Sequence, residues 1–137
     1  VLHLRSLALF DRLTTRELSD LATIVREERH SAGETIVREG DFDDSMFLLV
    51  AGEVDVTRGG LHLATTGAGE FFGEMAVLDG ETRSADVVAR TDVHLLRLER
   101  ADLFRLMDEQ PSIAIGICRT LSRRIRNLLA AGDAPKG

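Results

Sequence analysis

One stretch of this sequence, residues 71–89, has residue types and spacings suited to binding an anion. Gly73 permits a tight turn between a predicted strand and a short apolar run that is long enough for one helical turn. The first backbone N–H groups of a helix lack partners within it, so a helix start beside a glycine can bind an anion. Arg83 lies nine positions after Glu74, and its guanidinium can form a bidentate pair of hydrogen bonds with a phosphate. The Ser84 hydroxyl adds another donor.

Glu74 suits a different part of such a ligand. A carboxylate near a helix N-terminus is compatible with the helix dipole but repels a bare phosphate, so we assign it to a sugar hydroxyl. Ala85 leaves room for a ligand to lie close to the following strand. Each residue also has an ordinary structural interpretation, since a lone glycine is most often only a turn and an Arg–Glu pair is often a surface ion pair. The functional interpretation therefore depends on the whole stretch and on the strands that precede it.

The elements that must position this stretch change along the chain from helix to strands and back to helix. A Thr-x-x-Glu capping box at Thr14 starts an amphipathic helix of about three turns, and the turn at Gly33 ends that phase. From residue 35 to residue 99, short β-like runs are separated by glycines, and the glycine pair at 59–60 predicts a hairpin. Helical spacing then returns, and Pro111 separates two C-terminal helices.

The sequence therefore predicts a single α+β domain, an antiparallel β-roll (double-stranded jelly roll) flanked by an N-terminal helix and C-terminal helices. We place an N-terminal helical part at 1–32, the β-roll at 33–99, C-terminal helices at 100–131 and a tail at 132–137. With 137 residues, 44% of them apolar, the chain can build one core without disulfide or metal staples. Because it has no initiator methionine, we expect a piece of a longer or processed protein.

Composition disfavours several classes of function. A net charge of −6 disfavours nucleic acid and anionic membranes as partners of the whole domain. The longest apolar run has six residues, far fewer than the ~18 of a membrane span. The single cysteine, Cys118, excludes a disulfide framework, and we expect it to lie in the core beside the apolar stripe of the last helix.

Metal sites and catalytic motifs are disfavoured as well. The histidines lie far apart and form no His-x-His pair, which argues against a cupin-like metal enzyme. The segment 41–45 has the acidic residues of a calcium loop but lacks its glycine and its final glutamate, so we interpret it as an acidic turn. We predict no catalytic residue and no metal.

The stretch 71–89 resembles the phosphate-binding cassette of cyclic-nucleotide-binding domains, a family shared by catabolite-activator-type regulators, kinase regulatory subunits and gated ion channels. Residues 41–56 resemble the β-roll signature of the same family, with Gly40 and Gly52 at its turn positions. The likeness extends over nearly the whole chain, because the predicted flanking helices match too. It implies a non-enzymatic regulatory domain in the cytoplasm, or on the cytoplasmic face of a membrane-protein parent.

The resemblance also implies a role for each residue of the site. The residues around the cyclic phosphate would be Gly73, Met75, Ala76, Arg83, Ser84 and Ala85, several of them through backbone N–H groups, and Phe72 would also belong to the ligand site. Glu74 would accept a hydrogen bond from the ribose 2′-hydroxyl. Val56 and Leu63, on the inner face of the roll, would contact the base or ribose, and Leu128 on the last helix would belong to a lid.

Two departures from the family pattern affect what the site would select. Leu128 and Leu129 stand where catabolite-activator-type members carry hydroxyl side chains, which favours an apolar lid. Thr82 stands where many members have proline, which loosens the loop without removing a ligand group. Ser84 resembles the bacterial cyclic-AMP type, so we expect cyclic AMP rather than cyclic GMP.

The last helix combines an apolar stripe with a row of arginines. The stripe can serve either as a lid or as a dimer seam, which leaves a homodimer through this helix open. Arg119, Arg123 and Arg126 fall opposite the stripe, and we interpret them as a solvated face rather than a nucleic-acid contact. Arg124 projects from the apolar side, so we predict that it pairs with a core-side carboxylate or faces the ligand pocket.

The sequence thus predicts a cyclic-nucleotide-binding regulatory domain whose last helix moves on binding and is read by an effector outside this chain. The alternative is a degenerate member of the family that acts as an interaction or dimerisation module without nucleotide. A DNA-binding transcription factor would need a helix-turn-helix after the last helix, and this chain has none.

Overall fold

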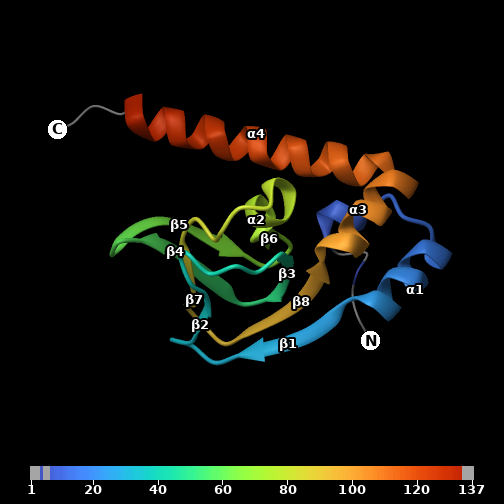
Figure 1. Cartoon of the computed structure of the whole chain (residues 1–137), viewed down its shortest axis with the longest axis horizontal. Coiled ribbons are helices and arrows are strands. Elements are labelled where there is room, and N and C mark those ends of the chain that lie inside the picture. Colours follow the sequence, from blue (N-terminus) through green and yellow to red (C-terminus); the bar gives the residue numbers. More distant parts are fainter. Residues whose placement is uncertain (1–3, 5–6, 134–137) are drawn as a thin grey trace.

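The computed structural model describes residue 4 and residues 7–133, and these residues form two four-stranded antiparallel sheets with helices packed beside them (Figure 1). The first sheet has the order β1-β8-β3-β6, made of strands Arg26–His30, Val93–Glu99, Ser45–Ala51 and Phe71–Phe72. The second sheet has the order β2-β7-β4-β5, made of strands Thr35–Val37, Asp86–Ala89, Glu53–Arg58 and Leu61–Gly67. The predicted α+β β-roll is therefore confirmed.

The N-terminal region leads into the first sheet through two helical segments, the 3-10 helix η2 (Ala8–Phe10) and the helix α1 (Thr15–Ile24). Helix α1 begins as predicted: the Thr14 hydroxyl accepts a hydrogen bond from the Glu17 N–H, and the Glu17 carboxylate accepts one from the Thr14 N–H. These two bonds satisfy donors that the helix itself cannot satisfy, which fixes the start of α1.

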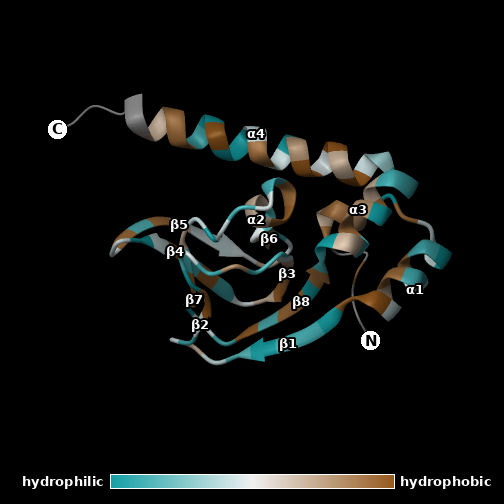
Figure 2. Ribbon diagram, viewed as in Figure 1, coloured by the Kyte–Doolittle hydropathy of each residue, from teal (hydrophilic) through white to brown (hydrophobic). Residues whose placement is uncertain are grey.

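Strand β1 lies within the range 1–32 that the sequence predicted as helical. In the described chain its only neighbour is β8, so it is an edge strand. Its residues are Arg-Glu-Glu-Arg-His, which show no apolar alternation, and Figure 2 shows it as a hydrophilic ribbon. Charged side chains on an edge strand discourage pairing with the strands of other chains. The charged residues that made β1 unrecognisable as a strand in the sequence are therefore suited to its position at the edge.

The core lies on both faces of the first sheet, as strand β3 shows. Residues 45–49 of this strand are all buried. Met46 and Leu48 belong to the cluster beneath the helices, whereas Phe47 and Leu49 belong to the cluster between the two sheets. A strand covered on both faces has a continuous apolar run instead of alternation, which explains the sequence of β3.

Two connections between secondary-structure elements were predicted at glycines. Gly59 and Gly60, with φ of +58° and +82°, join β4 to β5 as the predicted hairpin. Strand β6 leads through Gly73 into the short helix α2 (Glu74–Asp79), and the chain returns through residues 80–85 to β7.

The C-terminal helices are α3 (Arg100–Glu109) and α4 (Pro111–Asp133). Proline suits the first turn of α4, where its missing N–H would have no partner within the helix. Ile113 and Ile117 are buried, but every side chain from 125 to 131 is exposed, so only the first half of α4 packs on the core. The prediction that Cys118 lies in the core is wrong, because one position after Ile117 it is rotated by about 100° and is exposed. Among the described residues no helix has both the length and the apolarity that a bilayer requires.

Candidate functional site

The two segments of the predicted phosphate site, residues 72–76 and 83–85, lie together at the edge of the first sheet. Strand β6 pairs with β3, which holds the start of α2 against the β-roll. The second segment is fixed by the connection between β2 and β3: the Arg83 N–H donates to the Asp41 carbonyl, and the Gly40 N–H donates to the Arg83 carbonyl, both at 2.9 Å. Backbone hydrogen bonds therefore set the position of this loop.

Arg83 lies inside the domain, with its side chain 2% exposed. One terminal guanidinium nitrogen donates to the Gly73 carbonyl at 2.9 Å, and the other donates to the Ser45 carbonyl at 2.6 Å. The second nitrogen also lies 3.2 Å from the Asp43 carboxylate. The Nε–H is buried and has no hydrogen-bond partner in the described residues. A buried donor without an acceptor costs free energy, so this arginine is incompletely satisfied.

Gly73 is required both for its backbone conformation and for its missing side chain. Its φ of +80° lies in the left-handed region that favours glycine. A Cβ at this position would lie 2.8 Å from Nη1 of Arg83 and 3.4 Å from the Ser45 carbonyl oxygen. The missing side chain thus makes room for the Arg83 guanidinium beside the start of α2. Gly73 also leaves the first N–H groups of α2 without a side-chain cap.

Asp43 connects the site to the first sheet. It accepts hydrogen bonds from the Ser45 hydroxyl at 2.8 Å and from Arg97 at 3.0 Å, and it also faces Arg83. Burial raises the pKa of the Asp43 carboxyl, but the hydrogen bond from Ser45 and the charges of Arg83 and Arg97 outweigh burial, so this pKa lies below its ordinary value. The carboxylate is therefore ionised at neutral pH and fixes two arginines at once. The sequence predicted only an acidic turn here, because no local pattern shows which arginines will face it.

Glu74 is bound to the last helix through Arg124. Its side chain is 7% exposed, and Arg124 on α4 donates a hydrogen bond to Oε1 at 3.0 Å. The same guanidinium donates to the Phe71 carbonyl at 2.6 Å and lies 4.8 Å from the centre of the Phe71 ring. Oε2 of Glu74 accepts no hydrogen bond from the described residues. The prediction that Arg124 pairs with a core-side carboxylate is confirmed, and its partner is the residue assigned to the ribose.

The other ligand-site residues of the segments 72–76 and 83–85 differ in exposure. Phe72, Ala76 and Ala85 are buried, and the Phe72 ring stacks on Phe47 with 5.1 Å between centroids. Met75 and Ser84 are exposed and lie beside each other, with 3.9 Å between the Ser84 hydroxyl and the Met75 sulfur. The two segments therefore meet through exposed residues as well as through Arg83.

The residues assigned to the base are more exposed than Arg83 and Glu74, and their apolar side chains are not held by hydrogen bonds or ion pairs. Val56 is half-buried and packs against the core between the sheets. Leu63 is 42% exposed and Leu128 is 65% exposed, and neither belongs to a core cluster of the described residues. In this structure the phosphate side of the predicted site is assembled from contacting residues, whereas the base side is open.

The remaining polar residues of interest lie elsewhere. His30, His62 and His94 each contact a carboxylate, at 3.0, 3.3 and 3.1 Å, and His3 lies outside the described residues. Within the part of the chain that the structure describes, no three histidine, cysteine, aspartate or glutamate side chains gather as a metal site requires. Arg119, Arg123 and Arg126 are exposed, as predicted.

Several known proteins are similar to this chain in sequence or in structure. The sequence model of the cyclic nucleotide-binding domain family matches residues 27–110. A cyclic nucleotide-gated potassium channel of Rhizobium etli is 40% identical over 116 residues, which cover 85% of this chain and 32% of the channel. The cyclic AMP receptor protein of Thermus thermophilus is 35% identical over 123 residues, which cover 86% of this chain and 57% of that protein. This chain therefore spans only part of the length of these two relatives.

A solved structure agrees with the fold. The crystal structure of the Thermus thermophilus catabolite activator protein matches with a TM-score of 0.78 and 33% identity, over 91% of this chain and 61% of the other. The matched family range, 27–110, contains all but the first residue of β1 and every element from β2 to α3, including both segments of the phosphate side and Asp43. The chain belongs to the cyclic nucleotide-binding domain family.

Proposed function

We propose that this chain is a sensor domain that binds cyclic AMP and controls an effector outside the chain, with no enzymatic activity of its own. One observation carries the proposal: a buried arginine, Arg83, keeps an Nε–H without an acceptor in the described residues, beside the uncapped first turn of α2. A cyclic phosphate supplies a negative charge and acceptor oxygens to such a group of donors.

The phosphate would bind between the start of α2 and the segment 83–85. The backbone N–H groups of Met75 and Ala76 on one side, and of Ser84 and Ala85 on the other, would donate to it together with the exposed Ser84 hydroxyl. Arg83 is already fixed by two carbonyls and Asp43, so its guanidinium is oriented before the phosphate binds. Because its Nε–H is buried, the phosphate reaches this atom only if the covering segments open locally.

The ribose would bind to Glu74. Arg124 occupies Oε1 of this carboxylate and leaves Oε2 available for the 2′-hydroxyl. The ion pair also orients the Glu74 carboxylate, and a hydrogen bond to a charged group contributes roughly 1.5–3 kcal/mol. The Phe72 ring, which stacks on Phe47, would hold the backbone of this part of the site in place.

The base would lie over the second sheet, between Val56 and Leu63 and the apolar part of α4 near Leu128. The exposed leucines provide an apolar surface that a purine can cover. Cyclic AMP rather than cyclic GMP is supported by Ser84 and by the name of the Thermus thermophilus relative, a cyclic AMP receptor protein.

Helix α4 would carry the signal. Its exposed C-terminal part begins directly after Arg124, the residue that binds Glu74 and Phe71. In Figure 1 this part of the helix continues past α2 toward the C-terminus. A ligand that binds Glu74 therefore acts on the last anchored residue of α4 and shifts the populations of its free part. The exposed Ile125, Leu128 and Leu129 would then serve as a lid or as the seam of a homodimer.

Isothermal titration calorimetry with cyclic AMP, cyclic GMP and AMP tests the proposal, with Arg83→Ala as the control variant. We expect saturable heat from cyclic AMP, weaker binding of cyclic GMP, and loss of binding in the variant. Absence of heat from both cyclic nucleotides would favour the second candidate, a nucleotide-free interaction module. That candidate is supported by the two terminal nitrogens of Arg83, which already donate to protein carbonyls.

A variant pair tests the transmission step separately. Arg124→Ala should weaken cyclic AMP binding, because Glu74 loses the partner that orients it, and even at saturating ligand, labels on the C-terminal part of α4 should no longer report the ligand. Arg123→Ala, one position earlier and exposed, is the matched control and should behave like the parent protein. Loss of the response in both variants would contradict a specific role for Arg124.

A further inference from the structure

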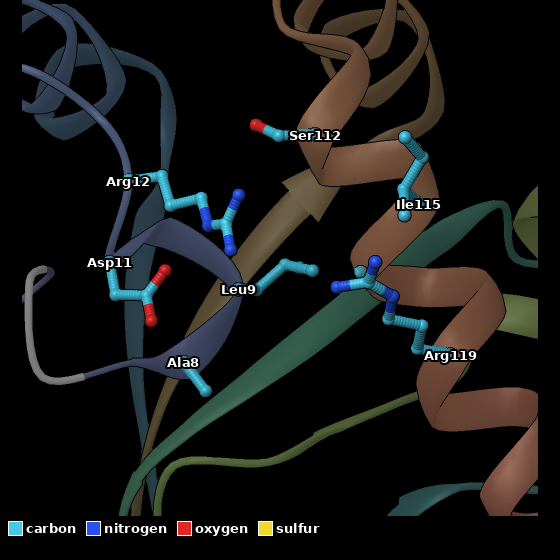
Figure 3. Close-up of a pocket in the computed structure, with 8 residues that line it drawn as sticks. Ala8, Leu9, Asp11, Arg12, Ser112, Ile115 and Arg119 are labelled. Carbon is cyan, nitrogen blue, oxygen red and sulfur yellow. The ribbon is translucent and has the colours of Figure 1, made fainter.

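A hollow of about 230 Å³ lies between the N-terminal segment and the first half of α4 (Figure 3). None of the residues assigned to the nucleotide lines it. Its apolar floor consists of Leu9, which is half-buried, and Ile115, which is 51% exposed. Ile115 alone would be ordinary surface, but together with Leu9 in a hollow it can form the apolar part of a binding site.

Gly116 lets Leu9 pack closely against α4 on the floor of this groove. A Cβ at this position would lie 3.1 Å from Cδ1 of Leu9, so even an alanine would press on the floor. Glycine inside a helix is destabilising relative to alanine. Its presence here therefore allows the close packing of Leu9 against α4, at some expense to the helix.

Two arginines line opposite walls of the groove. Figure 3 shows the side chains of Arg12 and Arg119 extending from the two walls, with Leu9 between them. Both arginines are exposed, and neither forms an ion pair with any described residue. At 100° per residue, Arg123 and Arg126 continue the same face of α4 beyond Arg119. The groove thus opens onto a positive strip in a chain of net charge −6.

We propose that this groove binds an acidic amphipathic segment of a protein partner, an interaction separate from the proposed nucleotide site. One aliphatic side chain of the segment would cover Leu9 and Ile115, and its carboxylates would pair with Arg12 and Arg119. Arginines around an apolar anchor are enriched in protein interfaces. The apolar floor favours an amphipathic protein segment over a nucleic acid, and the two arginines without ion-pair partners among the described residues favour carboxylates on that segment.

Fluorescence anisotropy with synthetic peptides tests this inference in the absence of nucleotide. The probes are labelled peptides, helical and extended, with leucine on one face and glutamate beside it, and matched peptides with glutamine in place of glutamate. We expect saturable binding of an acidic peptide and at least about tenfold weaker binding of its glutamine counterpart. Arg12→Glu and Arg119→Glu should each weaken binding by about tenfold, because they place like charges opposite the peptide.

Two further variants distinguish peptide binding in the groove from non-specific electrostatic attraction to the protein surface. Arg29→Glu makes the same charge change at an exposed position on β1 and should leave binding unchanged. Gly116→Ala changes no charge and should keep the fold, measured by circular dichroism, while its Cβ displaces Leu9 from the floor of the groove and weakens binding. Absence of saturable binding to every acidic peptide, or equal losses in Arg119→Glu and Arg29→Glu, would overturn the proposal. So would binding of a DNA duplex or phosphatidylserine vesicles, abolished by Arg119→Glu, when the peptides do not bind.

Discussion

The two sides of the proposed nucleotide site are built differently. On the phosphate side, Arg83 and Glu74 are 2% and 7% exposed and are held by hydrogen bonds to neighbouring segments. On the base side, Leu63 and Leu128 are exposed and belong to no core cluster of the described residues. The fold thus fixes the residues assigned to phosphate and ribose, whereas under the proposal contacts to the base would form only when α4 moves. Affinity should therefore depend on the phosphate side and base selectivity on α4.

The largest effect in this comparison is expected from Arg83→Ala. It should weaken cyclic AMP binding at least about 100-fold, because charge-assisted hydrogen bonds contribute roughly 1.5–3 kcal/mol each. It should also lower the melting temperature, since the carbonyls of Gly73 and Ser45 lose their donor. Arg97→Ala, which also removes a partner of Asp43, should lower stability but retain most of the affinity. Equal losses of affinity in calorimetry would contradict a specific role for Arg83.

A second expectation concerns Gly73 and Gly69, whose φ values are +80° and +90°. Only Gly73 is crowded, because a Cβ at Gly69 would meet nothing within 4 Å. Strain of this kind costs on the order of 1–3 kcal/mol, and in Gly73→Ala the displacement of Arg83 adds to it. Urea unfolding should show a larger loss of stability for Gly73→Ala than for Gly69→Ala, with weaker nucleotide binding in the former alone. Equal losses would show that crowding against Arg83 is unimportant.

Acid should affect the phosphate side through Asp43, whose pKa is lowered in the folded state. A lowered folded pKa means that the ionised carboxylate stabilises the fold. That contribution is complete above the ordinary pKa of about 4 and is lost as the pH falls through the lower folded value. Urea unfolding should be measured from neutral pH to about pH 3. The free energy of unfolding of the parent should exceed that of Asp43→Asn at neutral pH, and this difference should disappear below about pH 4. A difference that does not change with pH would contradict this assignment.

The smallest effect is expected on the base side. Leu128→Ala removes an exposed side chain, so its stability should stay within about 0.5 kcal/mol of the parent. Cyclic AMP affinity should fall by less than about tenfold, with a change in the ratio of cyclic AMP to cyclic GMP binding. Competition titrations measure this ratio, and an unchanged ratio would argue against Leu128 as part of the lid.

Much of the fold could be predicted because its signals are local. The capping box at Thr14, the glycine pair at 59–60 and Pro111 each specify one boundary through a short-range steric or hydrogen-bonding rule. Strand β1 could not be predicted, because it is held by pairing with β8 and not by an apolar pattern of its own. Cys118 was misplaced for a related reason: a rotation of one residue on α4 decides between core and solvent.

The site was predictable in its residues but less so in its contacts. The resemblance to a family named the two segments, yet the partners of Arg83 and Glu74 lie far away in the sequence. Ser45 is 38 positions from Arg83, and Arg124 is 50 positions from Glu74. Such contacts depend on how sheets and helices pack. Only the position of Arg124 on the apolar side of its helix indicated one of them in advance.

The most direct test of the account follows the Nε–H of Arg83 by nuclear magnetic resonance. This signal can be assigned from its absence in Arg83→Lys and then followed during titration with cyclic AMP or with adenosine, which lacks the phosphate. The account predicts that cyclic AMP shifts the Arg83 signal in proportion to the bound fraction and that adenosine does not. Saturation by cyclic AMP in calorimetry, with the Arg83 signal unmoved, would contradict the assignment of the phosphate to this arginine.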